Sequence, residues 1–251
     1  MAALYAGTSG WAYASWKPAF YPAKLASAKF LQFYATRLNT VEVNYSFRHY
    51  LTEKTLNGWI AGTPENFKFS IKAHQRITHI KKLREAAEDA RSFLASLQLL
   101  SESQKLGMVL FQLPPYLKAD LVLLDEFLAG MRRAAPFAFE FRHASWFTDG
   151  AFETLRKHGA AICVAETEDL ETPDVRTADF CYYRLRKPEY TAEERKGIVE
   201  KIQGRLGEGC DVFVYFKHED TPQGALYAEE LLGAVTRNGD QSDGAKVGHF
   251  N

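Results

Sequence analysis

FAFEFR, residues 137–142, alternates aromatic residues with smaller or charged ones, and this stretch decides the fold. Successive side chains of a β-strand point to opposite faces, so the three phenylalanines share one face while Glu140 and Arg142 share the other. Helices must cover the aromatic face. Glu140 and Arg142 then point into the interior of a barrel near its carboxyl end, where charges can face a pocket. The stretch therefore predicts one strand of a closed barrel.

Seven further β-rich runs recur at intervals of roughly 30 residues and alternate with segments of helical period. This alternation is typical of parallel strands joined by crossover helices. The expected strands are residues 4–8, 40–44, 67–73, 107–113, 137–142, 160–166, 180–186 and 212–218. The expected helices are residues 27–38, 52–61, 83–104, 120–133, 151–158, 191–206 and 224–237.

The ends of several expected helices carry recognisable signals. Thr191, followed three residues later by Glu194, resembles a capping box, and Gly159 follows another helix as a C-terminal stop. Residues 167–178 contain Pro173 and lack a convincing helical pattern. We therefore expect the sixth helix to be missing or reduced.

The strand and helix units favour a single (β/α)8 TIM-type barrel over an open doubly wound sheet. A chain of 251 residues, 46% hydrophobic and 25% charged, has the usual length and composition of one such barrel. No G-x-G-x-x-G follows the first strand and no Walker loop is present, so the open sheet lacks support. We expect the barrel to span residues 1–237, followed by a flexible tail at 238–251.

The charge balance and the cysteine content indicate which partners and which cellular compartment to expect. Lys plus Arg and Asp plus Glu both total 31, so no net field draws the protein toward nucleic acid or an anionic membrane. Three cysteines without C-x-x-C or zinc spacing indicate a reducing compartment. No basic leader is present, and no run approaches the about 18 apolar residues of a membrane span. We expect a cytoplasmic protein without membrane attachment and leave its oligomeric state open.

Nearly every expected strand has inward polar residues near its carboxyl end. In TVEVN, Glu42 and Asn44 point inward while the two valines point outward. The other strands contribute Ser70, Lys72, Gln112, Glu140, Arg142, Glu166, Tyr182, Arg184, Tyr215 and Lys217. One buried charge is readily explained by a paired neighbour. So many at one end of a barrel favour a ligand pocket, because a packed core has no use for many desolvated charges.

Several motifs are similar to those of the YecE-like family, number seventy-two in the series of domains of unknown function. They are GTSGWAYASW at 7–16, FYP at 20–22, TVEVNYSF at 40–47, LFQLPP at 110–115, EFRHASW at 140–146 and YFKHEDTPQG at 215–224. The resemblance implies an eight-stranded barrel and no established activity. It implies as pocket residues Gly10, Trp11, Glu42, Asn44, Gln112, Glu140, Arg142, His143, Trp146 and Arg184. Many members of the family have asparagines in place of Lys217 and His218.

Two carboxylates and a histidine are the candidates for proton transfer. Glu42 and Glu140 lie on strands roughly opposite each other, an arrangement that suits acid–base chemistry on a bound sugar or polyol. Arg142 favours the ionised form of Glu140, which makes Glu140 either a base or a structural ion-pair partner. His143, at the strand–loop junction, either carries a proton near neutral pH or caps the HASW loop through a backbone hydrogen bond.

Cations on the inner surface indicate an anionic ligand. Arg142 and Arg184 offer planar forks to a carboxylate or phosphate, and Lys72 adds a point charge. Trp11 and Trp146 follow two strands, where an indole ring either stacks on a ligand or packs over the barrel mouth. The other expected ligand contacts are Asn44, Gln112 and Tyr182. The cations oppose a divalent metal and no paired-histidine spacing supports one, so we expect no metal and no other cofactor.

These residues predict a pocket but not a reaction. We expect an enzyme that acts without metal on a small anionic or polyhydroxylated metabolite, with Glu42 or Glu140 as base and His143 as proton carrier. Hydrolase, lyase and isomerase chemistry stay open, and so does enzyme activity itself. One alternative is a module that binds a nucleotide or a single nucleic-acid strand without turnover. Another is an inactive scaffold barrel, in which these side chains pair with one another and occlude the mouth.

Overall fold

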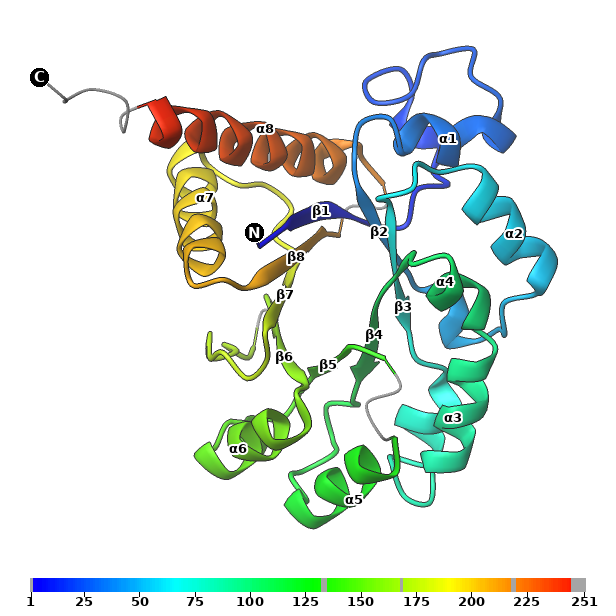
Figure 1. Ribbon diagram of the computed structural model, residues 1–251, viewed down its shortest axis with the longest axis vertical. Helices are drawn as coiled ribbons and strands as arrows, with labels where there is room; N and C mark the ends of the chain where they lie inside the picture. The colour runs from blue at the N-terminus through cyan, green and yellow to red at the C-terminus, as the bar shows by residue number, and fades with distance from the viewer. Residues whose placement is uncertain (1, 132–134, 168, 218–219, 245–251) are drawn as a thin grey trace, which may run out of the picture.

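The computed structural model describes residues 2–131, 135–167, 169–217 and 220–244. These residues form eight parallel strands that close into a barrel in the order of the sequence (Figure 1). The strands are β1 (Leu4–Ser9), β2 (Thr40–Val43), β3 (Lys68–Lys72), β4 (Leu106–Gln112), β5 (Phe137–Glu140), β6 (Ala161–Ala165), β7 (Phe180–Leu185) and β8 (Asp211–Phe216). The predicted (β/α)8 barrel is confirmed, and each predicted strand agrees with the structure within two residues at either end.

The helices surround the barrel on the outside (Figure 1). They are α1 (Phe30–Tyr34), α2 (Glu53–Ala61), α3 (Ala87–Ala95), α4 (Gln98–Glu102), α5 (Leu121–Met131), α6 (Asp149–His158), α7 (Ala192–Gly207) and α8 (Gln223–Gly244). Short 3-10 turns lie at Ala14–Trp16, Ser27–Lys29, Tyr45–Phe47 and Ala144–Trp146, and a π turn lies at Arg76–Ile80. No helix in the described part of the chain is both long and apolar enough to cross a membrane.

The connection between β6 and β7 lacks a helix in its described residues, as expected. An irregular loop replaces it on the side of the barrel between α6 and α7 (Figure 1). The helix ends also follow the expected signals. Thr191 Oγ1 accepts from Glu194 N and Thr191 N donates to Glu194 Oε2, so the capping box of α7 is formed. Gly159, with a φ of 63°, ends α6.

Three helix predictions were wrong in extent. The helix expected at 83–104 begins only at Ala87, because Leu83 and Glu85 adopt left-handed φ values of 68° and 47° that a helix cannot contain. It is also divided into α3 and α4. The helix expected at 27–38 is reduced to a 3-10 turn followed by α1. The last helix continues past its expected end to Gly244, so the predicted tail begins inside α8, and residues 245–251 lie outside the described residues.

The strands divide their side chains between two cores. The phenylalanines of β5 pack outward against the helices, as the FAFEFR pattern predicted. A second cluster fills the barrel interior and comprises Met108, Leu110, Ala138, Ala161, Cys163, Ala165, Tyr182, Phe213 and Tyr215. Inside the barrel, Tyr215 Oη donates to Ser70 Oγ at 2.7 Å and lies 2.8 Å from Thr40 Oγ1. The lower interior is therefore packed and internally hydrogen-bonded, which leaves the carboxyl end as the place for a ligand.

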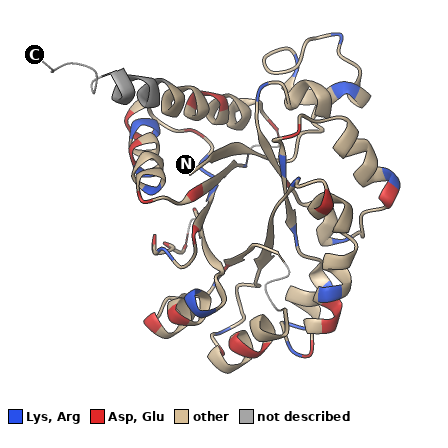
Figure 2. Ribbon diagram, viewed as in Figure 1, with Lys and Arg blue, Asp and Glu red and all other residues tan. Residues whose placement is uncertain are grey.

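Acidic and basic residues alternate along the outer helices. Figure 2 shows both signs on α3, α6 and α7. This distribution agrees with equal totals of 31 basic and 31 acidic residues.

Close approach of β1 and β2 explains the glycine in β1. Tyr34 Oη accepts from Thr8 N at 2.9 Å and donates to Thr40 O at 2.9 Å, so one hydroxyl bridges both strands. A Cβ atom at Gly7 would lie 2.0 Å from Thr40 O and 2.8 Å from Tyr34 Oη. These neighbours are backbone and a buried ring, which cannot move aside without opening the barrel.

We therefore predict that Gly7→Ala destabilises the protein by about 3 kcal/mol, because the methyl group overpacks a rigid strand pair. The matched control is Gly197→Ala, since a Cβ atom at this α7 position meets nothing within 4 Å. The control should be more stable than the wild type by about 0.5–1 kcal/mol. Urea unfolding followed by circular dichroism measures both changes. Equal stability of Gly7→Ala and wild type would contradict the close approach.

Candidate functional site

Arg184 joins two buried carboxylates across the interior of the barrel. Its Nη2 donates to Glu42 Oε1 at 2.7 Å, and its Nη1 donates to Glu140 Oε2. Arg184 is 3% exposed, and both glutamates are fully buried. The three residues come from β7, β2 and β5, which are not neighbours in the barrel. These charged hydrogen bonds therefore connect distant strands at the carboxyl end.

Glu42 is surrounded by hydrogen-bond donors. Ser9 Oγ donates to its Oε1 at 2.8 Å, Tyr182 Oη donates to its Oε2 at 2.7 Å, and Asn44 Nδ2 lies 3.3 Å from Oε1. Burial by itself raises the pKa of Glu42, but Arg184 and the Tyr182 and Ser9 hydroxyls outweigh burial and lower it below its ordinary value. Glu42 is therefore ionised at neutral pH, with its oxygens occupied by protein donors.

Three arginines surround Glu140. Besides Arg184, Arg142 Nε donates to Oε1 at 2.7 Å, and Arg186 Nη2 lies 3.2 Å and 3.3 Å from the two carboxylate oxygens. Burial raises the pKa of Glu140, but the three guanidinium groups outweigh burial and lower the pKa far below its ordinary value. The expectation that Arg142 favours ionised Glu140 is confirmed. A carboxylate held so firmly in its ionised form is a poor base, which argues against Glu42 or Glu140 in that role.

We call Glu42, Glu140, Arg142, Arg184 and Arg186 the arginine–carboxylate cluster. Among the described residues, Arg142 contributes only its Nε to this cluster, and the buried Nε of Arg186 has no hydrogen-bond partner. The side chains of Arg142 and Arg186 are 28% and 18% exposed, so both reach solvent. Arg184 directs both terminal nitrogens to the carboxylates. The Nε of Arg184 is likewise buried without a hydrogen-bond partner among the described residues, but the Arg184 side chain is only 3% exposed. Arg142 and Arg186 are therefore the arginines of the cluster that can reach an anion from solvent.

Lys72 is a further cation at this end of the barrel. It follows Ser70 on the inward face of β3, is half-buried, and places its Nζ 4.2 Å from the centre of the Phe47 ring. Within the described part of the chain its Nζ makes no hydrogen bond or ion pair. Burial first, and then the nearby Arg184, lower the pKa of Lys72 to about 8, although Glu140 opposes this shift. The amine therefore changes charge close to neutral pH.

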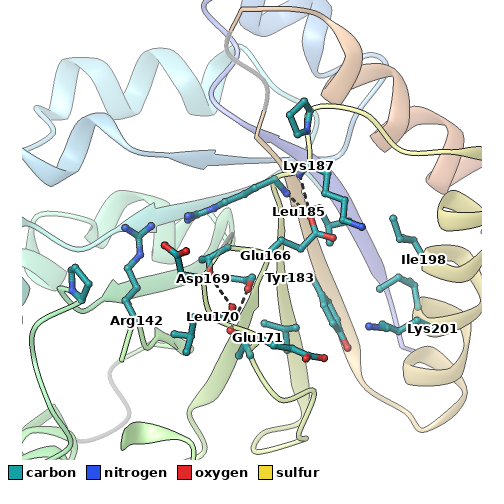
Figure 3. A pocket seen from close by; sticks show the side chains of 18 residues that line it. Arg142, Glu166, Asp169, Leu170, Glu171, Tyr183, Leu185, Lys187, Ile198 and Lys201 are labelled. Atoms are coloured by element: carbon teal, nitrogen blue, oxygen red, sulfur yellow. Dashed lines mark hydrogen bonds between the residues drawn. The ribbon is translucent and has the colours of Figure 1, made fainter. Parts of the chain in front are cut away.

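A cavity of about 1180 Å³ adjoins the cluster beside the connection between β6 and β7, whose described residues form no helix. Arg142 and Arg186 line its end at the barrel mouth, and Ile198 and Ile202 of α7 line its other side. Figure 3 shows Arg142 on one side of the cavity, with Ile198 and Lys201 on the opposite side. The outward faces of β6 and β7 form its floor through Val164, Tyr183 and Leu185. A barrel helix would normally cover this floor, so its absence creates the space.

Glu166 holds the loop after β7 at the edge of this cavity. Its Oε2 accepts from Arg186 N at 2.7 Å and from Lys187 N at 3.3 Å, and it also accepts from Tyr190 Oη. These bonds fix the backbone of Arg186. The carboxylate that the sequence placed at the end of strand six therefore positions an arginine of the cluster.

Two residues predicted to act on a ligand are tied into the loop after β5. His143 Nδ1 accepts from Ser145 N at 3.1 Å, so the histidine caps the HASW loop, the alternative that the sequence left open. Trp146 is 1% exposed, stacks on Phe141 at a centroid distance of 4.6 Å, and donates from Nε1 to Leu117 O. Trp146 is therefore a core residue, and its burial argues against stacking on a ligand.

Of the other residues predicted to contact a ligand, some lie against the arginine–carboxylate cluster and some lie apart from it. Asn44 and Tyr182 bond to Glu42, and Gln112 Oε1 lies 3.4 Å from Arg184 Nη1, so these residues orient the cluster. Trp11 packs edge-on against Trp59 and stays half-buried outside the cluster. At the end of strand eight, Lys217 is exposed, and His218 lies outside the described residues.

Arg186 is the cluster residue that the sequence analysis missed. It continues the inward alternation of Tyr182 and Arg184 by two residues, just past the end of β7. That alternation was the signal that could have found it.

A metal site was not expected from the sequence. In the described ranges no group of three or more His, Cys, Asp or Glu residues is arranged so that it could hold a metal ion. Metal independence remains a prediction.

Comparison with known proteins places this site in a family. A model of the family described as "Protein of unknown function DUF72" matches residues 5–247, nearly the whole chain. The chain belongs to the DUF72 family. The resemblance inferred from the motifs is thereby confirmed, and the family carries no established activity.

Known members of the family support the fold of this DUF72 protein. The UPF0759 protein YunF of Bacillus subtilis (strain 168) is 34% identical over 158 residues, which span 60% of this chain and 54% of YunF. The chain thus matches only about half of that relative. The crystal structure of a DUF72 family protein from Thermotoga maritima MSB8 is similar with a TM-score of 0.78 and 26% identity, covering 93% of this chain and 99% of that one. The crystal structure of a DUF72 family protein from Enterococcus faecalis V583 is similar with a TM-score of 0.73 and 18% identity, covering 93% of this chain and 98% of that one.

We predict that Arg184→Met destabilises the protein by about 3–5 kcal/mol at pH 8, because it leaves two buried carboxylates without their shared cation. In the wild type the lowered pKa values of Glu42 and Glu140 stabilise the fold above the unfolded pKa of about 4.3, and this stabilisation is lost as the pH falls below it. In the variant, Glu42 loses the one cation that it is paired with among the described residues, so burial dominates and its pKa rises, whereas Glu140 keeps Arg142 and Arg186. The variant should therefore regain stability as the pH falls from 8 to 5.

Urea unfolding at pH 5, 6.5 and 8 measures this difference. The control is Arg91→Met, an exposed arginine paired with exposed Glu88, which should cost less than about 1 kcal/mol at every pH. Equal pH profiles for Arg184→Met and wild type would contradict the bridging role of Arg184.

Proposed function

We propose that this protein is an enzyme that binds a small anionic metabolite at the barrel mouth and acts on it without a resident metal. The observation that carries the proposal is that both terminal nitrogens of Arg142 and the Nη1 of Arg186 make no hydrogen bond among the described residues, on side chains that reach solvent. Both arginines line the cavity and are oriented by the fully buried Glu140. Arginine held in this way offers a carboxylate or phosphate two directed donors without the cost of ordering a mobile side chain.

The charge of the cluster supports an anion. Its two carboxylates face three guanidinium groups within the described residues, and the Lys72 ammonium adds positive charge below pH 8. The excess positive charge lies where Arg142 and Arg186 meet solvent. A bound anion would neutralise it, whereas a divalent cation would be repelled.

The shape of the cavity suits a ligand larger than a simple anion. Beyond the arginines, Glu166, Thr167, Asp169, Glu171 and Thr172 contribute polar side chains, while Ile198 and Ile202 are apolar. Carboxylates and hydroxyls of this kind accept hydrogen bonds from the hydroxyl groups of a ligand. We therefore infer a metabolite with a carboxylate or phosphate at one end and hydroxyl groups along the rest.

Lys72 is the group that we assign to proton exchange. Its pKa of about 8 lies closer to neutral pH than those of Glu42 and Glu140, which are lowered. Efficient acid–base catalysts have pKa values near the working pH. This assignment replaces the two glutamates, whose hydrogen bonds are committed to the fold.

A cytoplasmic location belongs to the same proposal. Cys163, Cys181 and Cys210 are free, buried thiols, and such thiols suit a reducing compartment.

We predict that Arg142→Gln and Arg186→Gln each weaken binding of phosphate or citrate by about tenfold to a hundredfold, since a hydrogen bond to a charged group contributes about 1.5–3 kcal/mol. Isothermal titration calorimetry at low salt measures the change. The control is Arg76→Gln, whose side chain is exposed and paired with Asp89 outside the cluster. Equal affinities in wild type and both cluster variants, or no binding of either anion by wild type, would contradict the anion site.

The same affinity should depend on pH through Lys72. Below pH 8 the ammonium attracts the anion, and as the pH rises from 7 to 9 the amine loses its proton and the affinity falls. We predict a weaker affinity at pH 9 than at pH 7 for citrate, which keeps its charge over this range. Calorimetry of Lys72→Met should show no such decline, and an equal decline in this variant would assign the titration to another group.

Exposed tyrosines around the mouth favour a second candidate, a module that binds single-stranded nucleic acid. Tyr45 and Tyr116 are each 62% exposed and Tyr50 is 45% exposed, in the loops that follow β2 and β4. Tyr45 stacks on His49, and Lys82 lies 5.1 Å from the centre of the Tyr116 ring. Exposed rings beside cations are the stacking surfaces that such proteins use.

The test of this candidate is retention on a single-stranded DNA column as a function of salt. The nucleic-acid module predicts salt-sensitive retention that Tyr45→Ala and Tyr116→Ala each reduce by about tenfold, since base stacking contributes about 1–3 kcal/mol. Flow-through of wild type at low salt would exclude it and would leave the small-metabolite enzyme.

A further inference from the structure

Lys72 combines features that few lysines share. It is half-buried on the inward face of a strand, yet within the described residues no carboxylate pairs with its Nζ. The lysines of the outer surface differ, as Lys157 pairs with Asp125 and Lys187 pairs with Glu194. A carboxylate partner favours the ammonium form of an amine, which has no lone pair and cannot act as a nucleophile. Lys72 lacks this constraint and lies at the carboxyl end of β3, the end of the barrel at which Arg142 and Arg186 also lie.

We propose that Lys72 forms an imine with the carbonyl carbon of an anionic ketone or aldehyde, whose carboxylate or phosphate is bound by Arg142 and Arg186. The inference rests on the proposed anion site and names its substrate class. Lys72 ends β3 on its inward face, and Arg142 follows the carboxyl end of β5, which is separated from β3 only by β4. Two strand spacings amount to about 10 Å, so one small molecule can span the distance between these strand ends. The carbonyl group would then lie toward β3 and the anionic group toward the loops after β5 and β7.

The reaction balances without an added reagent. The Lys72 ammonium loses one proton, and the lone pair of the resulting amine forms a carbon–nitrogen bond to the carbonyl carbon. A second proton passes from this nitrogen to the carbonyl oxygen, which becomes a hydroxyl group. The proton first given up by the ammonium then protonates the hydroxyl group, which leaves as water when the carbon–oxygen bond breaks and the carbon–nitrogen double bond forms. Ammonium plus carbonyl thus becomes protonated imine plus water, with the same total charge and no change of oxidation state. The cationic imine then withdraws electrons from the neighbouring carbon, which suits lyase and isomerase chemistry.

The surroundings of Lys72 favour the neutral amine. Its pKa of about 8, against an ordinary value of 10.5, increases the fraction of free amine at pH 7 by roughly 300-fold. Burial is the first cause, and Arg184 and Arg142 oppose a further positive charge, whereas Glu140 and Glu42 act in the other direction. The Phe47 ring contacts the amine from one side.

His79 completes the charged and titratable surroundings. Its ring packs edge-on against Phe47 at a centroid distance of 4.9 Å. Burial, Lys72 and Arg142 lower the pKa of His79, so the imidazole is neutral at pH 7 and adds no further positive charge. The amine is therefore bounded by an aromatic ring and by cations, the setting in which a lysine acts as a nucleophile.

Reductive trapping tests the inference. The full-length protein is incubated at pH 7 with sodium cyanoborohydride and one of three probes: pyruvate, dihydroxyacetone phosphate or the uncharged hydroxyacetone. We expect a single reduced adduct with at least one of the two anionic probes, mapped to Lys72 by mass spectrometry of peptides. The two anionic probes distinguish a carboxylate from a phosphate substrate.

Three variants make the test specific. Lys72→Arg keeps the positive charge but supplies no nucleophilic amine, and it should lose the adduct. Lys118→Met removes an exposed lysine of the loop after β4 and should keep the wild-type rate. Arg142→Gln should slow trapping of the anionic probe by about tenfold or more while leaving hydroxyacetone unchanged, because only the anionic probe uses the arginine.

The outcomes separate this inference from the proposed function. An adduct on Lys72 that depends on Arg142 supports both. Phosphate or citrate binding in calorimetry without any adduct, or adducts spread over exposed lysines such as Lys118, overturns the imine and leaves the anion site intact. An adduct on Lys72 with equal rates for charged and uncharged probes, together with no anion binding, keeps the amine chemistry and overturns the anionic substrate.

Discussion

The carboxyl end of this barrel depends on one interaction, the sharing of Arg184 between Glu42 and Glu140. Two fully buried carboxylates are tolerated only if cations and hydrogen-bond donors compensate for the lost hydration. Arg184 supplies a positive charge and a hydrogen-bond donor to each of the two carboxylates. The bridge also determines the remaining pairings. Because Glu140 has oxygen sites left after binding Arg184, it orients Arg142 and Arg186 toward the mouth.

The connection between β6 and β7, which forms no helix in its described residues, leaves a space beside this charged cluster. In a complete barrel, a helix would cover the outward faces of β6 and β7, and the mouth would end at the strand tips. Here the loop between these strands leaves a cavity that begins at Arg142 and Arg186 and extends to α7. An anion anchor and room for the rest of a ligand therefore lie side by side. Hydrogen bonds from the backbone of Arg186 and Lys187 to Glu166 fix the border between them.

The inward residues could be predicted from alternation, but their roles could not. Period-two patterning placed Glu42, Glu140 and Arg184 inside the barrel correctly, because strand geometry leaves only two directions for a side chain. Whether an inward charge is a catalyst or a partner depends on distances between strands far apart in the sequence. Trp146 shows the same limit, since neither its stacking on Phe141 nor its hydrogen bond to the Leu117 carbonyl follows from its position after a strand.

Local patterns in the sequence were enough to predict the barrel, its strands to within two residues, and a missing or reduced helix between strands six and seven. These features depend on periodicity and turn chemistry within short segments of the chain. Which cations pair with the buried carboxylates, and which have N–H groups left for a ligand, follows from the folded barrel alone, because hydrogen bonds across it join β2, β5 and β7. Only the tertiary structure revealed the lowered pKa of Lys72, since burial and the field of distant arginines exist only after the strands have closed.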